Sequence, residues 1–425
     1  MTELKRVAII GGTRIPFCRS NTAYANLSNL DMLADTLQNL VDRYGLTGRK
    51  IDEVIAGAVT THSRDWNLAR EAVLSTSLSP ATPGTTLQMA CGTSLQAAML
   101  CAGRIASGQI DCAIAAGSDT TSDVPLVFQR RFAQRLVKAG QARDVMGRLR
   151  AFKGFRLGEL SPQAPANGEP RTRLSMGEHC ELMAKQWGIT RAEQDRLALE
   201  SHQKAAQAYQ EGFFDDLVSP YNGVARDNNL RADSSLEKLS TLKTVFDRTA
   251  NGTLTAGNST PLTDGASAVF LASEEYALTN GLQVQAWLTH ARTSAVDYVG
   301  GEGLLMAPTV AVSELLKASG LSLQDFDFYE IHEAFAAQVL CTLKAWESEE
   351  FCRNTLRLSG PLGAIDRNRL NVRGSSLALG HPFAATGARI LATLSKLLQN
   401  ENSGRGLISI CTAGGMGAAA ILEKA

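Results

Sequence analysis

Three long stretches of the chain contain no charged residue, and this feature constrains the fold most strongly. Lys, Arg, Asp and Glu make up 20% of the 425 residues, yet none of them occurs in residues 72–103, 374–388 or 406–422. Prolines interrupt the first stretch and glycines interrupt the third, which argues against membrane-spanning helices. The three stretches therefore predict buried elements that pack around one shared core.

The overall composition excludes several classes of protein. The 42 Lys and Arg residues balance the 42 Asp and Glu residues, so a general nucleic-acid binder is not expected. The N-terminal residues lack the apolar run of a signal peptide. The 8 cysteines form no CxxC pair and no Cys/His spacing typical of a zinc site. We therefore expect reduced thiols, no bound metal, and a cytoplasmic protein of two or three domains.

The order of strand-like and helical patterns predicts an α/β fold. Runs rich in Val and Ile alternate with helical patterns toward both ends of the chain. At each end a strand leads into a Gly-containing turn and an apolar helix, which suggests a duplicated core. Strands are expected over residues 6–10, 53–58, 111–116, 266–271, 283–291, 327–331 and 406–411, and helices over residues 29–44, 94–105, 309–318, 334–345 and 386–398.

The middle of the chain, residues 121–249, has a different character. It is richer in charged and polar residues and is broken by prolines, which predicts an inserted loop or cap domain. Within it, residues 130–156 carry nine Lys or Arg against one Asp, Asp144. This strip is either a solvated face or a binding surface for a phosphate-rich ligand, an anionic lipid surface or an acidic partner.

Each charge-free stretch holds one reactive side chain, and the first is Cys91. It stands in Gln-Met-Ala-Cys-Gly-Thr-Ser, directly before a predicted helix. The partial positive charge at a helix N-terminus stabilises a thiolate, so we expect a lowered thiol pKa and a nucleophilic role. Gly92 permits close approach of a substrate, and the amide of Cys91 is a candidate oxyanion donor.

His381 is the reactive side chain of the second stretch. Because Pro382 restricts it to an extended conformation, His381 is expected just before the helix over residues 386–398. The helix dipole there disfavours the imidazolium, which leaves a neutral ring that can accept a proton from a thiol. His381 is therefore the candidate general base for Cys91.

Cys411 and His332 complete the candidate site. Cys411 ends a predicted strand and opens Cys-Thr-Ala-Gly-Gly-Met-Gly, whose glycines bring backbone amides near the sulfur and suit a general acid and base. The segment lacks the Lys-Ser/Thr of a phosphate-binding loop. His332 lies where a strand gives way to a helix, a usual place for ligand sites in α/β folds. Two thiols and a base suit carbon–carbon bond formation or cleavage at an acyl thioester.

Five segments, in order, resemble the thiolases over essentially the whole chain. They are the Cys91 turn, Asn-Ser-Thr-Pro-Leu-Thr-Asp-Gly-Ala at residues 258–266, His-Glu-Ala-Phe at 332–335, Gly-His-Pro at 380–382, and the terminal Cys-x-x-Gly-Gly-x-Gly. The resemblance implies an α/β thiolase fold with a duplicated βαβαβαββ core in five layers (αβαβα). It divides the chain into an N-terminal core (1–120 and 250–275), a loop domain over coenzyme A (121–249) and a C-terminal core (276–425).

The resemblance also implies a role for each candidate. Cys91 matches the acylated nucleophile, His381 the base that activates it, and Cys411 the acid and base at the α-carbon. His332 occupies the position where many thiolases have Asn, and His-Glu-Ala-Phe is similar to the thiolase subunit of fatty-acid oxidation trifunctional complexes. Positions that match coenzyme-lining residues are Ser175, Met176, Ala256 and Thr260.

The implied activity is ping-pong thiolysis of 3-ketoacyl-CoA in fatty-acid β-oxidation, with coenzyme A as co-substrate and no permanent cofactor. Acetoacetyl-CoA synthesis is the alternative within the family. Implied partners are a second copy of the chain, in a homodimer or larger homo-oligomer, and a hydratase/dehydrogenase α subunit. Membrane contact by residues 121–160 stays open, and nucleic acid is not expected.

Three competing functions are weighed against this one. A condensing ketoacyl synthase is disfavoured by Cys411 and its glycines. A non-catalytic acyl-CoA carrier is disfavoured because Cys91, His381 and Cys411 are all present. A dithiol redox protein is disfavoured because the chain has no CxxC pair.

Two positions depart from the family pattern. Ala413 stands where the terminal motif most often has Gly, and Ser375 replaces one glycine of the usual Gly-Gly. Because the family uses the backbone amide at position 413, the oxyanion role requires backbone angles that Ala can adopt. Neither departure removes a reacting group.

Overall fold

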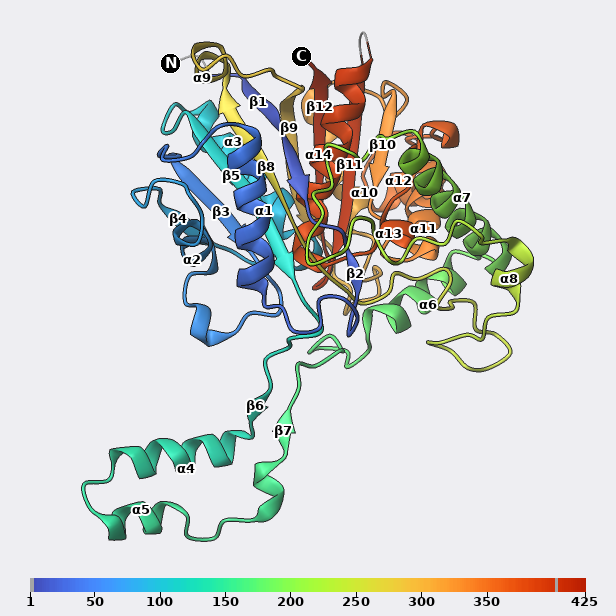
Figure 1. The fold of residues 1–425 in the computed structure, drawn as a ribbon. Coiled ribbons are helices and arrows are strands. Elements are labelled where there is room, and N and C mark those ends of the chain that lie inside the picture. The colour runs from blue at the N-terminus through green and yellow to red at the C-terminus, as the bar shows by residue number, and fades with distance from the viewer. Residues whose placement is uncertain (1–3, 402–403) are drawn as a thin grey trace.

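The computed structural model describes residues 4–401 and 404–425 (Figure 1). Ten strands form one mixed sheet, in the order β10-β11-β12-β9-β1-β8-β5-β3-β4 with β2 paired to β8, and β6 and β7 form a separate ribbon. The strands are β1 (Val7–Arg14), β2 (Cys18–Arg19), β3 (Glu53–Gly57), β4 (Gly84–Thr86), β5 (Cys112–Asp119), β6 (Val127–Phe128), β7 (Pro162–Gln163), β8 (Thr263–Ser273), β9 (Ala286–Ala295), β10 (Phe328–Ile331), β11 (Arg405–Thr412) and β12 (Met416–Lys424).

Helices cover the faces of this sheet and extend beyond it. They are α1 (Asn29–Arg43), α2 (Leu68–Leu74), α3 (Thr93–Ala106), α4 (Arg130–Gln141), α5 (Val145–Ala151), α6 (Met176–Gln186), α7 (Arg191–Gln210), α8 (Leu236–Ser240), α9 (Glu274–Thr279), α10 (Ala307–Ser319), α11 (Ala336–Glu347), α12 (Glu349–Asn354), α13 (Ser376–Leu379) and α14 (Thr386–Asn400). None of the helices in the described part of the chain is long and apolar enough to cross a membrane.

The sheet consists of two halves that share a short seam. The N-terminal half runs β4-β3-β5-β8-β1 and the C-terminal half runs β9-β12-β11-β10. At the seam β1 pairs with β9 through only two residue pairs, Ala8 with Trp287 and Ile9 with Ala286. The blue-to-yellow strands and the red-to-orange strands of Figure 1 correspond to these halves.

The alternation of side chains along the strands defines the layers. In β1, Val7 and Ile9 pack in the core cluster that contains α3 and α14, whereas Ala8 and Ile10 pack in the cluster of α1 and α2. Successive strand residues point to opposite faces of a sheet, so the two helix pairs cover opposite faces of the N-terminal half.

The C-terminal half repeats this arrangement. Ile408 of β11 faces the cluster of α3 and α14, and its neighbour Leu407 faces the cluster of α10 and α11. The resulting order is α1/α2, N-terminal half, α3/α14, C-terminal half and α10/α11. These five layers confirm the expected fold class, with α3 and α14 as the central layer.

Most of the elements expected in the two cores are confirmed. Each of the seven expected strands overlaps a strand of the large sheet, and each of the five expected helices overlaps a helix. The sequence analysis did not predict β12, whose segment Met-Gly-Ala-Ala-Ala has low strand propensity. This strand forms because it pairs with β11 on one side and β9 on the other. The boundaries of the three expected domains stay a prediction.

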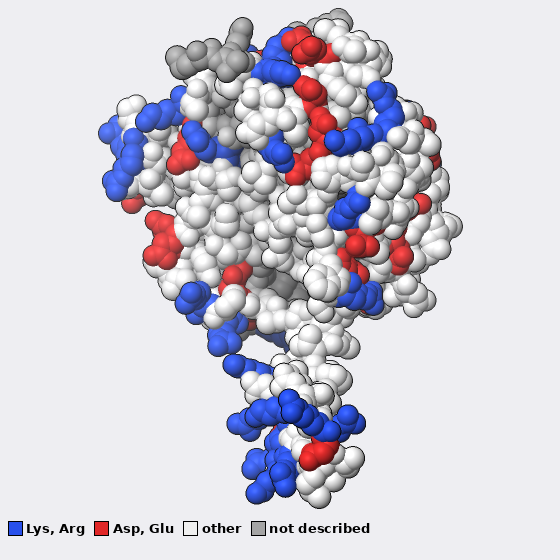
Figure 2. Space-filling model, turned by 90° about the vertical axis from the view of Figure 1, so that its left-hand side faces the viewer, with Lys and Arg blue, Asp and Glu red and all other residues white. Residues whose placement is uncertain are grey.

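The middle of the chain separates into two parts. Helix α6 packs against the C-terminal half, where Cys180, Met183 and Ala184 join the cluster of α10 and α11. Residues 127–163, which we call the arm, instead project away from the body of the molecule (Figure 1). No residue of α4 or α5 is buried. Figure 2 shows Lys and Arg side chains gathered on this arm.

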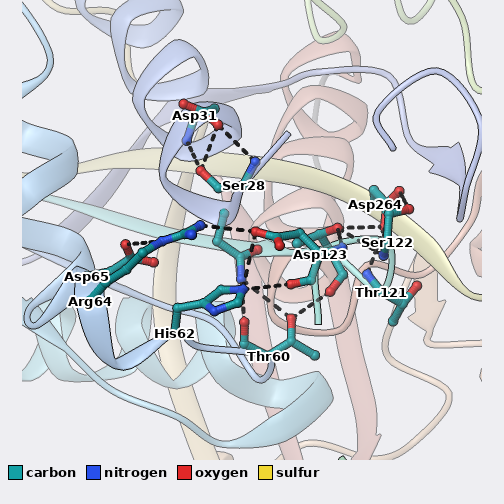
Figure 3. Close-up of polar contacts among 12 residues, drawn as sticks. Ser28, Asp31, Thr60, His62, Arg64, Asp65, Thr121, Ser122, Asp123 and Asp264 are labelled. Atoms are coloured by element: carbon teal, nitrogen blue, oxygen red, sulfur yellow. Dashed lines mark hydrogen bonds and ion pairs between the residues drawn. The ribbon is translucent and has the colours of Figure 1, made fainter. Parts of the chain in front are cut away.

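The arm has an aromatic centre and an anchored root. Phe132 packs against Phe128, Phe152 and Phe155, with ring centroids 5.1, 6.4 and 5.8 Å away. At the root, Asp264 of β8 accepts hydrogen bonds from the backbone N–H groups of residues 121 and 122 at 2.8 and 3.2 Å (Figure 3). The chain therefore leaves the sheet from a fixed point.

Candidate active site

The N-terminal turns of α3 and α14 pack against each other in the central layer. The backbone N–H of Ala388 donates to Ser94 Oγ at 2.8 Å. Gly387 permits this approach, because a Cβ atom there would lie 2.3 Å from the backbone nitrogen of Leu95. Since Cys91 directly precedes α3 and His381 lies shortly before α14, this helix contact places the two side chains side by side.

Cys91 lies in the short 3-10 turn Ala90–Gly92 that leads into α3. Thr93 holds the turn, because its Oγ1 donates to the carbonyl of Ala90 at 2.7 Å and accepts from the N–H of Met89 at 2.9 Å. A Cβ atom on Gly92 would lie 2.9 Å from Thr412 Cγ2. Glycine at this position therefore lets the end of β11, which carries Cys411, approach the nucleophile.

His381 is hydrogen-bonded to Cys91. Its Nε2 lies 3.1 Å from Cys91 Sγ, and its Nδ1 lies 2.6 Å from Thr386 Oγ1. The backbone N–H of His381 donates to Thr263 Oγ1 at 2.7 Å, and Gly380 before it has φ +105°. A ring that donates from Nδ1 to Thr386 presents the lone pair of Nε2 to the thiol, which is the arrangement a general base needs.

The pKa of Cys91 contradicts the sequence-based expectation. Burial, with a smaller contribution from the charge of Asp119, raises the pKa of the thiol to about 12. The expected lowering by the helix N-terminus is therefore wrong for the free protein, because removal of the sulfur from water outweighs the dipole. The backbone amide of Ala413 faces the sulfur and offsets part of the rise.

His381 is neutral, as expected, but mainly for a different reason. Burial, with a smaller contribution from the nearby charge of Arg389, lowers the pKa of the ring to about 3. Cys91 and His381 are therefore a neutral thiol–imidazole pair at neutral pH. The proton moves from sulfur to nitrogen only when the sulfur attacks an electrophile.

His332 lies against His381, directly after β10. The two ring centroids are 4.2 Å apart, and His332 is fully buried. Its Nδ1 is 2.8 Å from Ser376 Oγ, whereas its Nε2 has no hydrogen-bond partner in the described structure. Burial lowers its pKa well below the ordinary value, with contributions from His381 and Arg389. His332 is therefore a neutral ring with one unpaired nitrogen beside the Cys91–His381 pair.

Cys411 approaches the nucleophile from the end of β11. It is 1% exposed, and burial together with the neighbouring Cys91 raises its pKa well above the ordinary value. A thiol that stays protonated at neutral pH suits a proton donor. Gly414 and Gly415 turn the chain after it with φ +78° and +70°, whereas Ala413 is not among the residues with positive φ. Alanine is therefore compatible with the backbone at position 413.

Three donor atoms of the site also fit a metal ion in number and type. Ligand atoms of Cys91, His332 and His381 all lie within 4.8 Å of one another. Sulfur and imidazole nitrogen are ligands that Zn²⁺ prefers. The Cys91–His381 hydrogen bond uses two of these atoms, so a metal would have to replace the proton that the pair shares.

In the described structure, no residue expected to line coenzyme A forms a hydrogen bond with Cys91, His332, His381 or Cys411. Ser175 caps α6, where its Oγ donates to Glu178 Oε2 at 2.7 Å, and Met176 is the first residue of that helix. Thr260 Oγ1 donates to the carbonyl of Ala334 at 3.0 Å, and Ala256 is exposed. Their role in coenzyme binding stays a prediction.

Polar residues that were not expected from the sequence hold the site together. Glu333 accepts hydrogen bonds from Ser201 Oγ and Asn371 Nδ2, both at 2.7 Å, and from the N–H of Leu377 at 3.2 Å. It therefore ties α7, the loop before α13 and α13 to the segment that carries His332. The one available signal was an acidic residue in an otherwise apolar block, directly after His332.

Ser376 and Arg389 were also missed. Both lie inside or next to the second charge-free stretch, and Arg389 is a fully buried cation. Arg389 Nη2 donates to Ser376 Oγ at 2.8 Å and to Ser375 Oγ at 3.3 Å. Ser375 itself has a negative φ of −143°, so the backbone does not require glycine and the departure from Gly is tolerated there.

Comparison with known proteins agrees with the layout of the fold. Residues 7–275 match the family described as thiolase, N-terminal domain, and residues 282–424 match thiolase, C-terminal domain. The chain is 41% identical over 424 residues to a 3-ketoacyl-CoA thiolase of Yersinia pestis (strain Pestoides F), covering 98% of this chain and 97% of that protein.

Two solved structures are similar over the full length. The acetyl-CoA acetyltransferase of Bacillus anthracis superposes with a TM-score of 0.82 at 31% identity, covering 100% of both chains. The Acat5 thiolase from Ascaris suum in complex with coenzyme A superposes with a TM-score of 0.80 at 27% identity, covering 99% of this chain and 100% of that chain.

Proposed function

This chain belongs to the thiolase family, and we propose that it is a 3-ketoacyl-CoA thiolase of fatty-acid β-oxidation. It cleaves 3-ketoacyl-CoA with coenzyme A to acetyl-CoA and a shortened acyl-CoA. The observation that carries this proposal is the 3.1 Å contact between Cys91 Sγ and His381 Nε2, with the thiol of Cys411 approaching from the end of β11.

The first half of the reaction acylates Cys91. The thiol gives its proton to His381 Nε2 and the sulfur attacks the 3-keto carbon, which forms a carbon–sulfur bond. The backbone N–H groups of Cys91 and Ala413 stabilise the tetrahedral oxyanion, and a lost donor costs on the order of 3 kcal/mol. The bond between the α- and β-carbons then breaks, and the electron pair leaves on the enolate of acetyl-CoA.

The second half regenerates the enzyme. Cys411 protonates the α-carbon of the enolate, and acetyl-CoA leaves. The thiol of coenzyme A then gives its proton to the Cys411 thiolate and attacks the acyl group on Cys91. Cys91 departs as a thiolate and recovers its proton from His381. Every proton is returned, so the chemistry requires no metal or redox cofactor.

The direction of the reaction separates this proposal from its alternative. The same groups run in reverse would make acetoacetyl-CoA, which is the activity in the name of the Bacillus anthracis relative. We favour thiolysis of longer substrates because the relatives with 41% identity are named 3-ketoacyl-CoA thiolases.

Coenzyme A enters this proposal as co-substrate. We assign its binding to Ser175, Met176, Ala256 and Thr260, and the cover over it to the part of residues 121–249 that packs on the body. The neighbouring buried His179, whose ring stands edge-on to Tyr298 with centroids 5.8 Å apart, adds a polar surface beside the start of α6.

We further propose a homodimer or larger homo-oligomer, with a hydratase/dehydrogenase subunit as a candidate partner. Strand β4 is the last strand of its half and leaves one edge unpaired in the described structure. Asn67 donates a hydrogen bond to the carbonyl of Gly84 in this strand, and the adjacent Trp66 is 93% exposed. All 8 cysteines are free, which suits a reducing cytoplasm.

The test is a thiolysis assay with purified protein and coenzyme A across 3-ketoacyl-CoAs from acetoacetyl-CoA to long-chain substrates. We expect kcat/KM to be higher for longer chains than for acetoacetyl-CoA. A preference for acetoacetyl-CoA would support the alternative, and no cleavage of any substrate would refute both.

A further inference from the structure

Each of the two buried histidines of the site has a hydroxyl beside its Nδ1, but the two rings differ at Nε2. His381 Nδ1 faces Thr386 Oγ1, and its Nε2 faces the thiol of Cys91. His332 Nδ1 faces Ser376 Oγ, and its Nε2 has no partner in the described structure. A neutral imidazole carries one proton, so the role of His332 depends on which nitrogen holds it.

Arg389 determines the direction of the hydrogen bond between Ser376 and His332. A guanidinium can only donate, and Arg389 Nη2 donates to Ser376 Oγ at 2.8 Å. The hydroxyl has one hydrogen of its own, and the acceptor that the described contacts offer for it is His332 Nδ1. If Nδ1 carried the proton instead, the hydroxyl hydrogen would be buried without an acceptor, which is strongly disfavoured.

We propose that Ser376 and Arg389 are positioning residues that fix His332 in the tautomer with its proton on Nε2. In this tautomer the unpaired Nε2–H is a hydrogen-bond donor on the ring beside His381, and we assign it to the enolate oxygen of the departing acetyl-CoA. The inference rests on the proposed thiolysis and names how one donor for that reaction is oriented.

The charge of Arg389 supports the same role. Arg389 is fully buried, and its Nε and Nη1 have no hydrogen-bond partner in the described structure. The nearby Glu330 is also buried, and burial raises its pKa to about 8, so its carboxyl group is largely protonated at neutral pH. With Glu330 protonated, Glu333 and Asp227 remain as the carboxylates that act on Arg389. Together with burial, the positive charge of Arg389 lowers the pKa of both imidazoles, and it favours negative charge on a bound oxygen.

The chain provides a matched pair of variants. Ser376→Ala removes the hydroxyl between Arg389 and His332. Ser375→Ala removes the adjacent hydroxyl, which also contacts Arg389, at 3.3 Å, and makes no hydrogen bond to His332. Melting temperatures of both variants show whether the fold is retained.

We expect Ser376→Ala to lower kcat for thiolysis roughly 10- to 100-fold, with KM for 3-ketoacyl-CoA within about threefold of wild type, because a transition-state donor is lost. We expect Ser375→Ala to stay within about threefold in both constants. In the His332→Ala background, Ser376→Ala should cost less than about twofold, because the two residues act through one donor. Equal losses in both backgrounds would overturn the inference.

A second measurement does not depend on turnover. Nitrogen-15 spectra of histidine-labelled wild-type protein, with His332 assigned by comparison with His332→Asn, report the tautomer directly. We expect a protonated Nε2 and an unprotonated Nδ1 on His332. A protonated Nδ1 would overturn the inference even if thiolysis is normal, whereas a wild-type protein without thiolysis would refute the proposed function and leave the tautomer measurable.

Discussion

The buried centre and the arm use opposite physical means. At the centre, Cys91, His332, His381 and Cys411 are each at most 4% exposed, and burial shifts the pKa values of the thiols upward and those of the histidines downward. In the arm, α4 and α5 have no buried residue and carry a dense set of Lys and Arg. Proton transfer between neutral groups requires the buried environment of the centre. A dense set of charged side chains is stable only where water solvates it, as in the arm.

The difference teaches where a substitution should matter. In the centre the polar atoms are buried and have few hydrogen-bond partners, so the loss of a single partner has a large effect. In the arm every Lys and Arg except Arg135, which pairs with the buried Glu159, is exposed to water, where an individual ion pair contributes about 0–1 kcal/mol. Four substitutions or measurements test this contrast, from the largest expected effect to the smallest.

The largest effect is expected at the nucleophile. Cys91→Ser should lower kcat/KM for thiolysis by at least about 10⁴-fold, because an alcohol beside a histidine is a far weaker nucleophile than a thiol. Cys101→Ser is the matched control. Cys101 is also a buried thiol on α3, but in the described structure His381 is hydrogen-bonded to Cys91 and not to Cys101. The comparison fails if the two variants lose activity equally while both remain folded.

A smaller, selective effect is expected at the second thiol. Cys411→Ala should still accept an acyl group on Cys91 from acyl-CoA, because His381 alone activates that sulfur. It should lose exchange of the α-proton of acetyl-CoA and reduce thiolysis by about 10³-fold, the range expected for a missing acid and base. Proton exchange measured by NMR checks this result, and exchange at the wild-type rate would remove Cys411 from the mechanism.

The third prediction concerns pH. Because the pKa of Cys91 is raised to about 12 and that of His381 is lowered to about 3, neither group titrates between pH 6 and 8.5. The rate of Cys91 alkylation by iodoacetamide should therefore rise steadily with pH across this range without levelling off, because the thiolate fraction of a thiol far below its pKa grows about tenfold per pH unit. Peptide mass spectrometry follows Cys91. An inflection near the ordinary cysteine value of about 8.5, or below it, would indicate a lowered thiol pKa.

The smallest effect is expected in the arm. Reversal of three exposed charges, Arg143→Glu, Arg148→Glu and Arg150→Glu together, should leave the melting temperature within about 2 °C and kcat within about twofold. The same variant should bind a phosphate-rich ligand or acidic partner more weakly at low salt if the strip is a binding surface. A large loss of kcat would show that the arm takes part in the catalytic centre.

The reacting groups could be predicted from the sequence because each stands at the end of an expected strand or the start of an expected helix, and Cys91 and His381 stand beside glycine or proline. Local patterns of this kind do not depend on contacts distant in sequence. The structure brings Cys91, His381 and His332 together, with Cys411 near Cys91, as expected. The pKa of Cys91 could not be predicted, because the depth of burial depends on α14 and β11, which are distant in sequence. The link from Arg389 through Ser376 to His332 was hidden for the same reason.

The arm also shows a limit of prediction from the sequence. Its charge was evident from composition, and so was its separation from the cores. Its projection from the body was not, because the sequence does not show that Phe128, Phe132, Phe152 and Phe155 pack on one another. A small aromatic cluster lets the arm fold without contact to either half of the sheet.

The central claim is that the sulfur of Cys91 carries the acyl group between the two halves of the reaction. The most direct measurement is peptide mass spectrometry of the protein mixed with a 3-ketoacyl-CoA in the absence of free coenzyme A. The account predicts one shortened acyl group per chain, on Cys91, released when coenzyme A is added. An acyl group on Cys411, or normal turnover with no acylated Cys91 at any time, would contradict it.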